Sequence, residues 1–192
     1  MTLALPERFV LFDTEYTAWE GSMERGWSRK GEHKEVIQIG AVKTSLATLA
    51  EESVFSILVR PVKNPELSPY IIALTGITQE RVNAEGVTLG EALSDFADFI
   101  GDLPAFSYGD DGAVIEGNCA LTGTPYPFAQ GRFQDIRPVI TPLLVGLGID
   151  TERYSSGTLI QAFGKAPTLR AHDAVNDMRN LLAVLRELQD RI

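Results

Sequence analysis

The sequence predicts an α/β domain in which helices flank a mixed, five-stranded central sheet. Three strand-like segments come first and follow one another in a row, which favours an antiparallel meander. Strand-like and helical segments then alternate, as they do where helices join parallel strands. The 192 residues contain no internal repeat and no Pro/Gly/Ser-rich linker. We therefore expect a single domain over residues 1–192.

The first expected strand, residues 9–12, is a short continuous apolar run of the kind found in buried central strands. Residues 16–34 follow as a polar stretch with three glycines, and we expect a long loop there. Two further segments are rich in β-branched side chains, which favours strands. The remaining strands are expected at residues 35–43, 53–60, 105–108 and 131–134.

The clearest helix signal begins at Thr88, which can form a capping box with Glu91. The apolar side chains that follow fall on one helical face as far as Ile100. A helix over residues 136–147 should be interrupted at Pro142, because proline lacks the backbone N–H. Further helices are expected at residues 69–75, 112–121, 158–163 and 173–191.

The net charge of −9 comes from 17 basic and 26 acidic residues. An acidic surface binds nucleic acid poorly without a specific site. Any such binding must therefore occur at a local site, where bound divalent metals would reverse the negative electrostatic potential. The single cysteine, Cys119, excludes an intrachain disulfide framework, which fits a cytoplasmic protein. Residues 1–9 do not resemble a signal peptide, and the longest apolar run, 139–149, is too short to span a bilayer.

Asp13 and Glu15 end the first expected strand, two positions apart. The period of a strand places both on one face, where two carboxylates repel each other by about 1 to 4 kcal/mol. Such a pair is typical of a cation site or a shared proton. The alternative is that Glu15 already lies in the loop and points into water.

His172 and Asp177 mark the start of the last helix. Residues five apart lie on different sides of a helix, so the two converge only if His172 precedes the first turn. Asp173 is a suitable N-cap, which places the helix start there. The alternative is a capped surface helix with an exposed histidine.

Asp110 and Asp111 follow the fourth expected strand, where sites on α/β sheets collect. Two acids beside a glycine are equally ordinary in turns.

Taken together, these motifs resemble the DEDDh exonucleases, the DnaQ-like branch of the RNase H-like fold. Asp13 and Glu15 match the D-x-E motif of the family, and His172 with Asp177 matches its last motif. Residues 35–42 resemble its second strand, and residues 74–78 (LTGIT) are very close to another characteristic stretch. The match covers nearly the whole chain, from about Phe9 to the end of the last helix.

The chain departs from the family pattern before the third of the four acids. Many family members have an asparagine there, whereas this chain has Ser-Tyr-Gly-Asp-Asp. It is closer to the subgroup of KapD and the histone-mRNA exonucleases, in which a glycine follows the strand. We assign Asp111 rather than Asp110 as the third acid, because Val114 and Ile115 then fall where the family packs its helix into the core.

The resemblance implies a 3′–5′ exonuclease that uses two divalent ions, Mg²⁺ or Mn²⁺, held by acids from three segments. It also implies that His172 accepts a proton from the attacking water, which suits imidazole because it titrates at about pH 6.5. The implied ligands are Asp13, Glu15, Asp111 and Asp177, and the implied contacts to the terminal nucleotide are Tyr16, Thr17, Leu74 and Thr75.

The expected partners are single-stranded RNA or DNA 3′ ends, from which nucleoside 5′-monophosphates are released; a homodimer stays open. Residues 16–34 interleave aromatic and basic side chains, which suits single strands, but acids nearly balance the charge and a mobile surface loop is an equal alternative. Two other functions stay open: a proofreading or processing subunit of a larger complex, and a non-catalytic nucleic-acid-binding module on the same fold.

Overall fold

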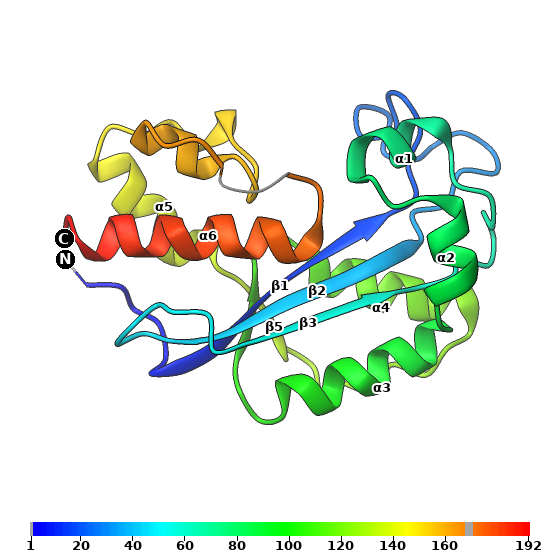
Figure 1. Ribbon diagram of the computed structural model, residues 1–192, viewed down its shortest axis with the longest axis horizontal. Coiled ribbons are helices and arrows are strands. Elements are labelled where there is room, and N and C mark those ends of the chain that lie inside the picture. The colour runs from blue at the N-terminus through cyan, green and yellow to red at the C-terminus, as the bar shows by residue number, and fades with distance from the viewer. Residues whose placement is uncertain (1, 168–170) are drawn as a thin grey trace.

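The computed structural model describes residues 2–167 and 171–192 of the chain. Its centre is a five-stranded sheet with the order β3-β2-β1-β4-β5 (Figure 1). Strands β1, β2 and β3 form the expected antiparallel meander, and β4 and β5 extend the sheet in parallel with β1. The bounds are Arg8–Tyr16 for β1, Val36–Ser45 for β2, Ser53–Leu58 for β3, Ala105–Ser107 for β4 and Phe133–Asp135 for β5.

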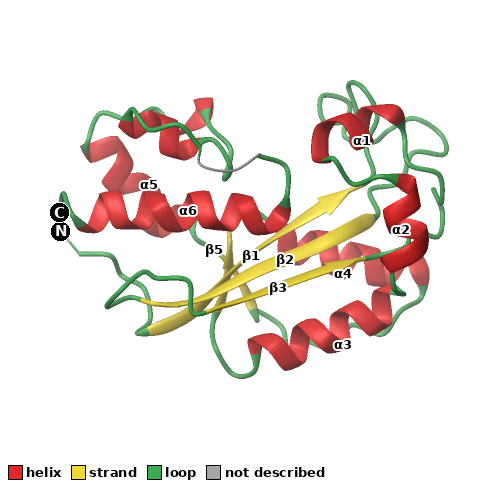
Figure 2. Ribbon diagram, in the orientation of Figure 1, coloured by secondary structure: helices red, strands yellow, loops and turns green. Residues whose placement is uncertain are grey.

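Helices cover both faces of this sheet, as Figure 2 shows in red around the yellow strands. Helices α5 and α6 lie over one face, α3 and α4 lie over the other, and α1 and α2 stand beyond the carboxyl end of β1. Their bounds are Pro69–Thr75, Gln79–Glu85, Leu89–Ile100, Asp111–Thr122, Arg137–Gly146 and Ala174–Gln189 for α1 to α6, with 3₁₀ turns η1 at Thr151–Arg153 and η2 at Leu159–Phe163.

The apolar run of β1 is continuous because both of its faces are buried. Phe9 and Leu11 belong to the core cluster beneath α5 and α6. Val10 and Phe12 belong to the cluster beneath α3 and α4. This alternation decides which face every later residue of the strand occupies.

Two helix caps follow the expected chemistry. The hydroxyl of Thr88 accepts a hydrogen bond from the N–H of Glu91, and the N–H of Thr88 donates the reciprocal bond of a capping box to the Glu91 carboxylate, at the start of α3. Asp173 caps α6 by accepting from the N–H of Asn176 at 3.1 Å. Within the described residues, no helix combines the length and the apolarity that crossing a bilayer requires.

Two expectations about elements were wrong, and one helix was not expected. Helix α5 passes through Pro142 without interruption, because Pro142 and Pro138 lie on its exposed side, where water can satisfy the carbonyl freed by proline. Strand β5 begins at Phe133, two residues later than expected. Helix α2 was missed, since its seven residues bury only Val82 and carry no apolar stripe.

Candidate active site

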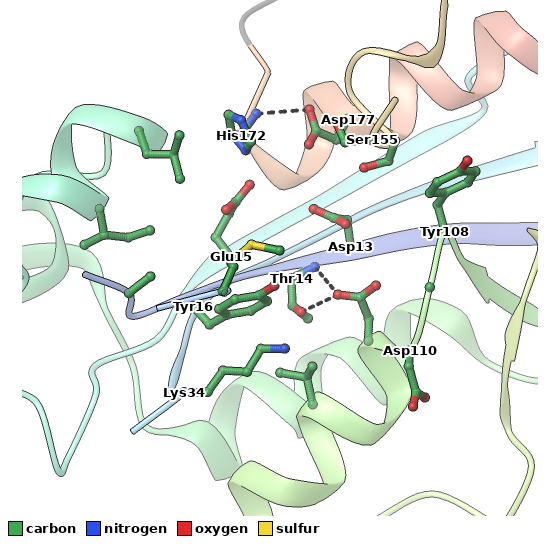
Figure 3. A pocket seen from close by; sticks show the side chains of 18 of the residues that line it. Asp13, Thr14, Glu15, Tyr16, Lys34, Tyr108, Asp110, Ser155, His172 and Asp177 are labelled. Atoms are coloured by element: carbon green, nitrogen blue, oxygen red, sulfur yellow. Dashed lines mark hydrogen bonds between the residues drawn. The ribbon is translucent and has the colours of Figure 1, made fainter. Parts of the chain in front are cut away.

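Strand β1 carries the first two acids of the site. Because Phe9 and Leu11 face helix α6, the alternation of the strand also turns Asp13 and Glu15 toward α6. Both carboxylates point into one cavity in Figure 3. The expectation that the two acids share a face is confirmed.

Strand β2 lets helix α6 approach these acids closely. Gly40 is the β2 partner of Asp13 in the antiparallel register. A Cβ on Gly40 would lie 2.6 Å from the backbone nitrogen of Val175 and 2.7 Å from the carbonyl carbon of Ala174. The first turn of α6 therefore occupies the space that any other side chain at Gly40 would fill, and this brings Asp177 near Asp13.

Gln38 fixes the start of α6 from the same strand. It is the β2 partner of Glu15. Its side-chain oxygen accepts from the N–H of Ala174 at 3.1 Å, and its side-chain nitrogen donates to Asp173 at 3.2 Å. The sheet thus satisfies one of the N–H groups that every helix start leaves unpaired.

His172 stands just before the N-cap of α6, as the spacing of the motif requires. Its φ of +63° bends the chain so that its own N–H donates to Oδ1 of Asp177 at 3.2 Å. A ring nitrogen of His172 and one oxygen each of Glu15 and Asp177 lie within 4.8 Å of one another. Residues five apart converge because only Asp177 belongs to the helix proper.

Asp111 reaches the same site from the first position of α4. Its Oδ1 accepts from the hydroxyl of Thr14 at 2.6 Å and from the N–H of Thr14 at 3.2 Å. Asp110 also borders the cavity but points away from the other acids in Figure 3. This placement supports Asp111 as the third acid.

Burial disfavours the charged forms of all four acids, and repulsion from neighbouring acids adds to it at Asp13 and Glu15. Burial and the charges of Asp111, Glu15 and Asp177 raise the pKa of Asp13 well above its ordinary value. Burial, followed by the charge of Asp177, raises the pKa of Glu15 to about 8, and burial raises the pKa of Asp177 to about 7. Burial also raises the pKa of Asp111, although the hydrogen bonds from Thr14 act in the opposite direction. An arrangement of this kind is typical of a catalytic or cation-binding centre.

The cavity that these groups border has a volume of about 380 Å³. Apolar and aromatic side chains form the wall beside the acids, among them Ala18, Met23, Tyr70, Ile71 and Leu74. The exposed fractions of Met23 and Tyr70 are 69% and 39%, so both present apolar surface to a ligand. Sequence reasoning missed them, because nothing in the local pattern distinguishes a wall residue from an ordinary surface residue.

Two of the four expected nucleotide contacts border the cavity, namely Tyr16 and Leu74. Thr17 is buried, where its hydroxyl donates to the carbonyl of His33 and accepts from the N–H of Glu35. Thr75 is buried as well and bonds within the α1 corner. The structure places these two threonines behind the wall, and their contact with a nucleotide stays a prediction.

Comparison with known proteins agrees with this geometry. Residues 10–106 match the RNase_T family, described as exonuclease. The 3′-5′ exonuclease Snipper of Drosophila melanogaster is 30% identical over 197 residues, which cover 92% of this chain and 67% of the fly protein. ERI1 exoribonuclease 2 of Xenopus laevis is 33% identical over 99 residues, which cover 50% of this chain and 13% of the frog protein. The chain thus corresponds to a small part of that longer relative.

A solved structure shows the same fold. The nuclease domain of 3′hExo, a DEDDh family member crystallised with rAMP, superimposes with a TM-score of 0.77 and 24% sequence identity. The superposition covers 96% of this chain and 92% of that domain. The mixed sheet and its flanking helices therefore form the DnaQ-like, RNase H-like fold that the sequence predicts.

Proposed function

The chain belongs to the DEDDh family of 3′–5′ exonucleases, and from this premise we propose that it removes nucleotides from the 3′ ends of single-stranded RNA or DNA and releases nucleoside 5′-monophosphates. The observation that carries the proposal is the convergence of Asp13, Glu15, Asp111, Asp177 and His172 from three distant segments on one cavity. That rAMP is bound in a domain of the same fold is consistent with such a product.

The donor set fits a pair of hard divalent cations, Mg²⁺ or Mn²⁺. Such ions prefer oxygen ligands, and all four acids offer carboxylate oxygens. The raised pKa values of Asp13, Glu15 and Asp177 mean that their charged forms lack compensation within the protein, which cations would supply. When bound, two ions activate a water molecule and stabilise the leaving oxygen.

His172 is the proposed general base. Its ring lies beside the oxygens of Glu15 and Asp177, so it borders the space where an attacking water would stand. The hydrogen bond from its backbone N–H to Asp177 fixes the segment that carries the ring. A base held in place in this way contributes about 10²- to 10⁴-fold to the rate.

The wall of the cavity is the proposed site of the terminal nucleoside. Tyr70 and Leu74 come from α1, and Met23 comes from the loop after β1. Apolar and aromatic surfaces bind the faces of bases without regard to sequence, which suits an enzyme that removes any nucleotide.

Digestion of oligonucleotides labelled at either end tests the proposal. RNA and DNA strands carrying a 3′ or a 5′ label are incubated with Mg²⁺, Mn²⁺ or a chelator, and the Asp13→Asn variant serves as the inactive control. We expect the 3′ label to leave first as a mononucleotide, and no cleavage with the chelator. Internal cuts, 5′–3′ polarity or activity in the chelator would each contradict the proposal.

A further inference from the structure

One cationic side chain stands among the acids of the cavity. Lys34 is the only lysine or arginine among the described residues that border it, whereas five carboxylates do so. In Figure 3 its side chain extends beneath Tyr16. The part of the chain that the structure describes offers Lys34 no carboxylate within ion-pair distance.

Two aromatic rings hold the ammonium group, and the charges of Asp111 and Asp110 attract it from beyond ion-pair distance. Nζ of Lys34 lies 4.0 Å from the ring centroid of Tyr16 and 5.0 Å from that of Trp27. The rings meet edge to face, with centroids 5.5 Å apart, and the indole N–H of Trp27 donates to the carbonyl of Thr17 at 2.9 Å. Cation–π contacts orient a charge without neutralising it.

The backbone at Lys34 is fixed as well. Asn118 of α4 is 4% exposed, and its side-chain nitrogen donates to the carbonyl of Lys34 at 2.9 Å. The side-chain oxygen of Asn118 accepts from the N–H of Val36 at 2.8 Å. Lys34 is therefore anchored at the entrance to β2, unlike the exposed Lys30 of the same loop.

Lys34 is thus a fixed cation that forms no ion pair with a carboxylate of the described residues. We propose that Lys34 is a substrate-binding residue that contacts a phosphate of the nucleic-acid backbone adjacent to the scissile phosphate. The assignment rests on the function proposed above. Two divalent ions would balance the four acids, so the charge of Lys34 remains available, and the anion that such a substrate brings is phosphate.

Lysine variants give the first test. Lys34→Met should raise KM for single strands about tenfold and leave kcat nearly unchanged, because it removes binding that the ground state and the transition state share. The slope of log KM against log salt should fall by about 0.7, the value for one phosphate contact on a single strand. Lys30→Met is the matched control and should change neither quantity. Lys34→Arg retains the charge and should recover most of the affinity.

Neutral linkages identify the contact directly. Strands carry one methylphosphonate at the second, third or fourth linkage from the 3′ end, and the scissile linkage stays natural. At the second linkage, which adjoins the scissile one, we expect the wild-type enzyme to lose about tenfold in kcat/KM, and Lys34→Met to lose nothing further. Melting temperatures of all variants, measured without metal, show whether each is folded. If Lys34→Met is not folded, Lys34→Gln takes its place.

Equal penalties in both enzymes at all three linkages would overturn the assignment, as would a wild-type KM and salt slope in folded Lys34→Met. If the wild-type enzyme cleaves natural strands, such results remove Lys34 alone from the binding site. If it cleaves neither RNA nor DNA, the proposed function and this assignment fall together.

Discussion

Gly40 and Asp13 are partners across strands β2 and β1, and the missing side chain of the first sets the surroundings of the second. The backbone of Ala174 and Val175 fills the place of a Cβ at Gly40. Since Asp177 lies one turn further along the same helix, the spacing between the acids depends on a residue that carries no chemistry.

We predict that Gly40→Ala destabilises the protein by about 1–3 kcal/mol, the usual cost of overpacking a tight contact, and lowers activity by displacing α6. The matched control is Gly117→Ala in α4, where a Cβ would meet nothing within 4 Å. That change should stabilise the helix by about 0.5–1 kcal/mol. Thermal unfolding measures both, and a Gly40→Ala protein as stable as the wild type would show that the contact is easily relaxed.

Replacing an acid should separate activity from stability. Asp13→Asn and Asp177→Ala should each lower turnover at least about a hundredfold. In the absence of metal, Asp13→Asn should melt higher than the wild type, because it replaces a carboxyl group whose charged form is destabilised by burial and by the neighbouring acids. Nuclease assays and melting curves on the same samples decide the matter, and a lower melting temperature would show that the Asp13 carboxylate has a compensating partner.

The two neighbouring aspartates should differ in importance. Asp111→Asn should impair cleavage more than Asp110→Asn, since Asp111 faces Thr14 and the other acids while Asp110 points away. Initial rates at saturating Mg²⁺ provide the comparison. The reverse order would transfer the ligand role to Asp110.

His172→Ala should reduce kcat at least about a hundredfold and leave the melting temperature within a few degrees of the wild type. The backbone N–H that bonds Asp177 survives the substitution, so the fold of the segment is retained. Rates measured across pH report the change. Activity equal to that of the wild type would exclude His172 as the base.

Stability without metal should fall as pH rises. Glu15 and Asp177 have folded-state pKa values of about 8 and about 7, whereas in the unfolded chain both titrate near pH 4. Between these limits the folded state binds more protons than the unfolded state, so unfolding becomes easier from about pH 4 to about pH 8. Mg²⁺ or Mn²⁺ should therefore raise the melting temperature more at pH 8 than at pH 6. Equal increments at the two pH values would show that the acids are already ionised at pH 6.

The candidate metal-binding acids and the candidate base could be predicted from the sequence, because each follows a local structural rule. The period of a strand places Asp13 beside Glu15, and the N-cap at Asp173 puts His172 ahead of the helix. The packing of Val114 and Ile115 favoured Asp111, and the structure places that side chain toward the other acids.

The rest depends on contacts between distant segments. The roles of Gln38 and Gly40 follow from a register that pairs them with Glu15 and Asp13, and no local pattern specifies that register. Lys34 is one of several basic residues in its loop, and only the positions of Tyr16 and Trp27 distinguish it. Polar threonines in a motif give no sign of whether they face a ligand or the protein interior.

The acids of the site come from opposite ends of the chain, and this affects the protein during its synthesis. Asp13 lies in the first strand, and Asp177 lies in the last helix. A growing chain still attached to the ribosome presents Asp13 and Glu15 long before His172 and Asp177 have been made. It cannot assemble the four-acid site at that stage, so the site forms only once the last helix has been made and has packed against β1.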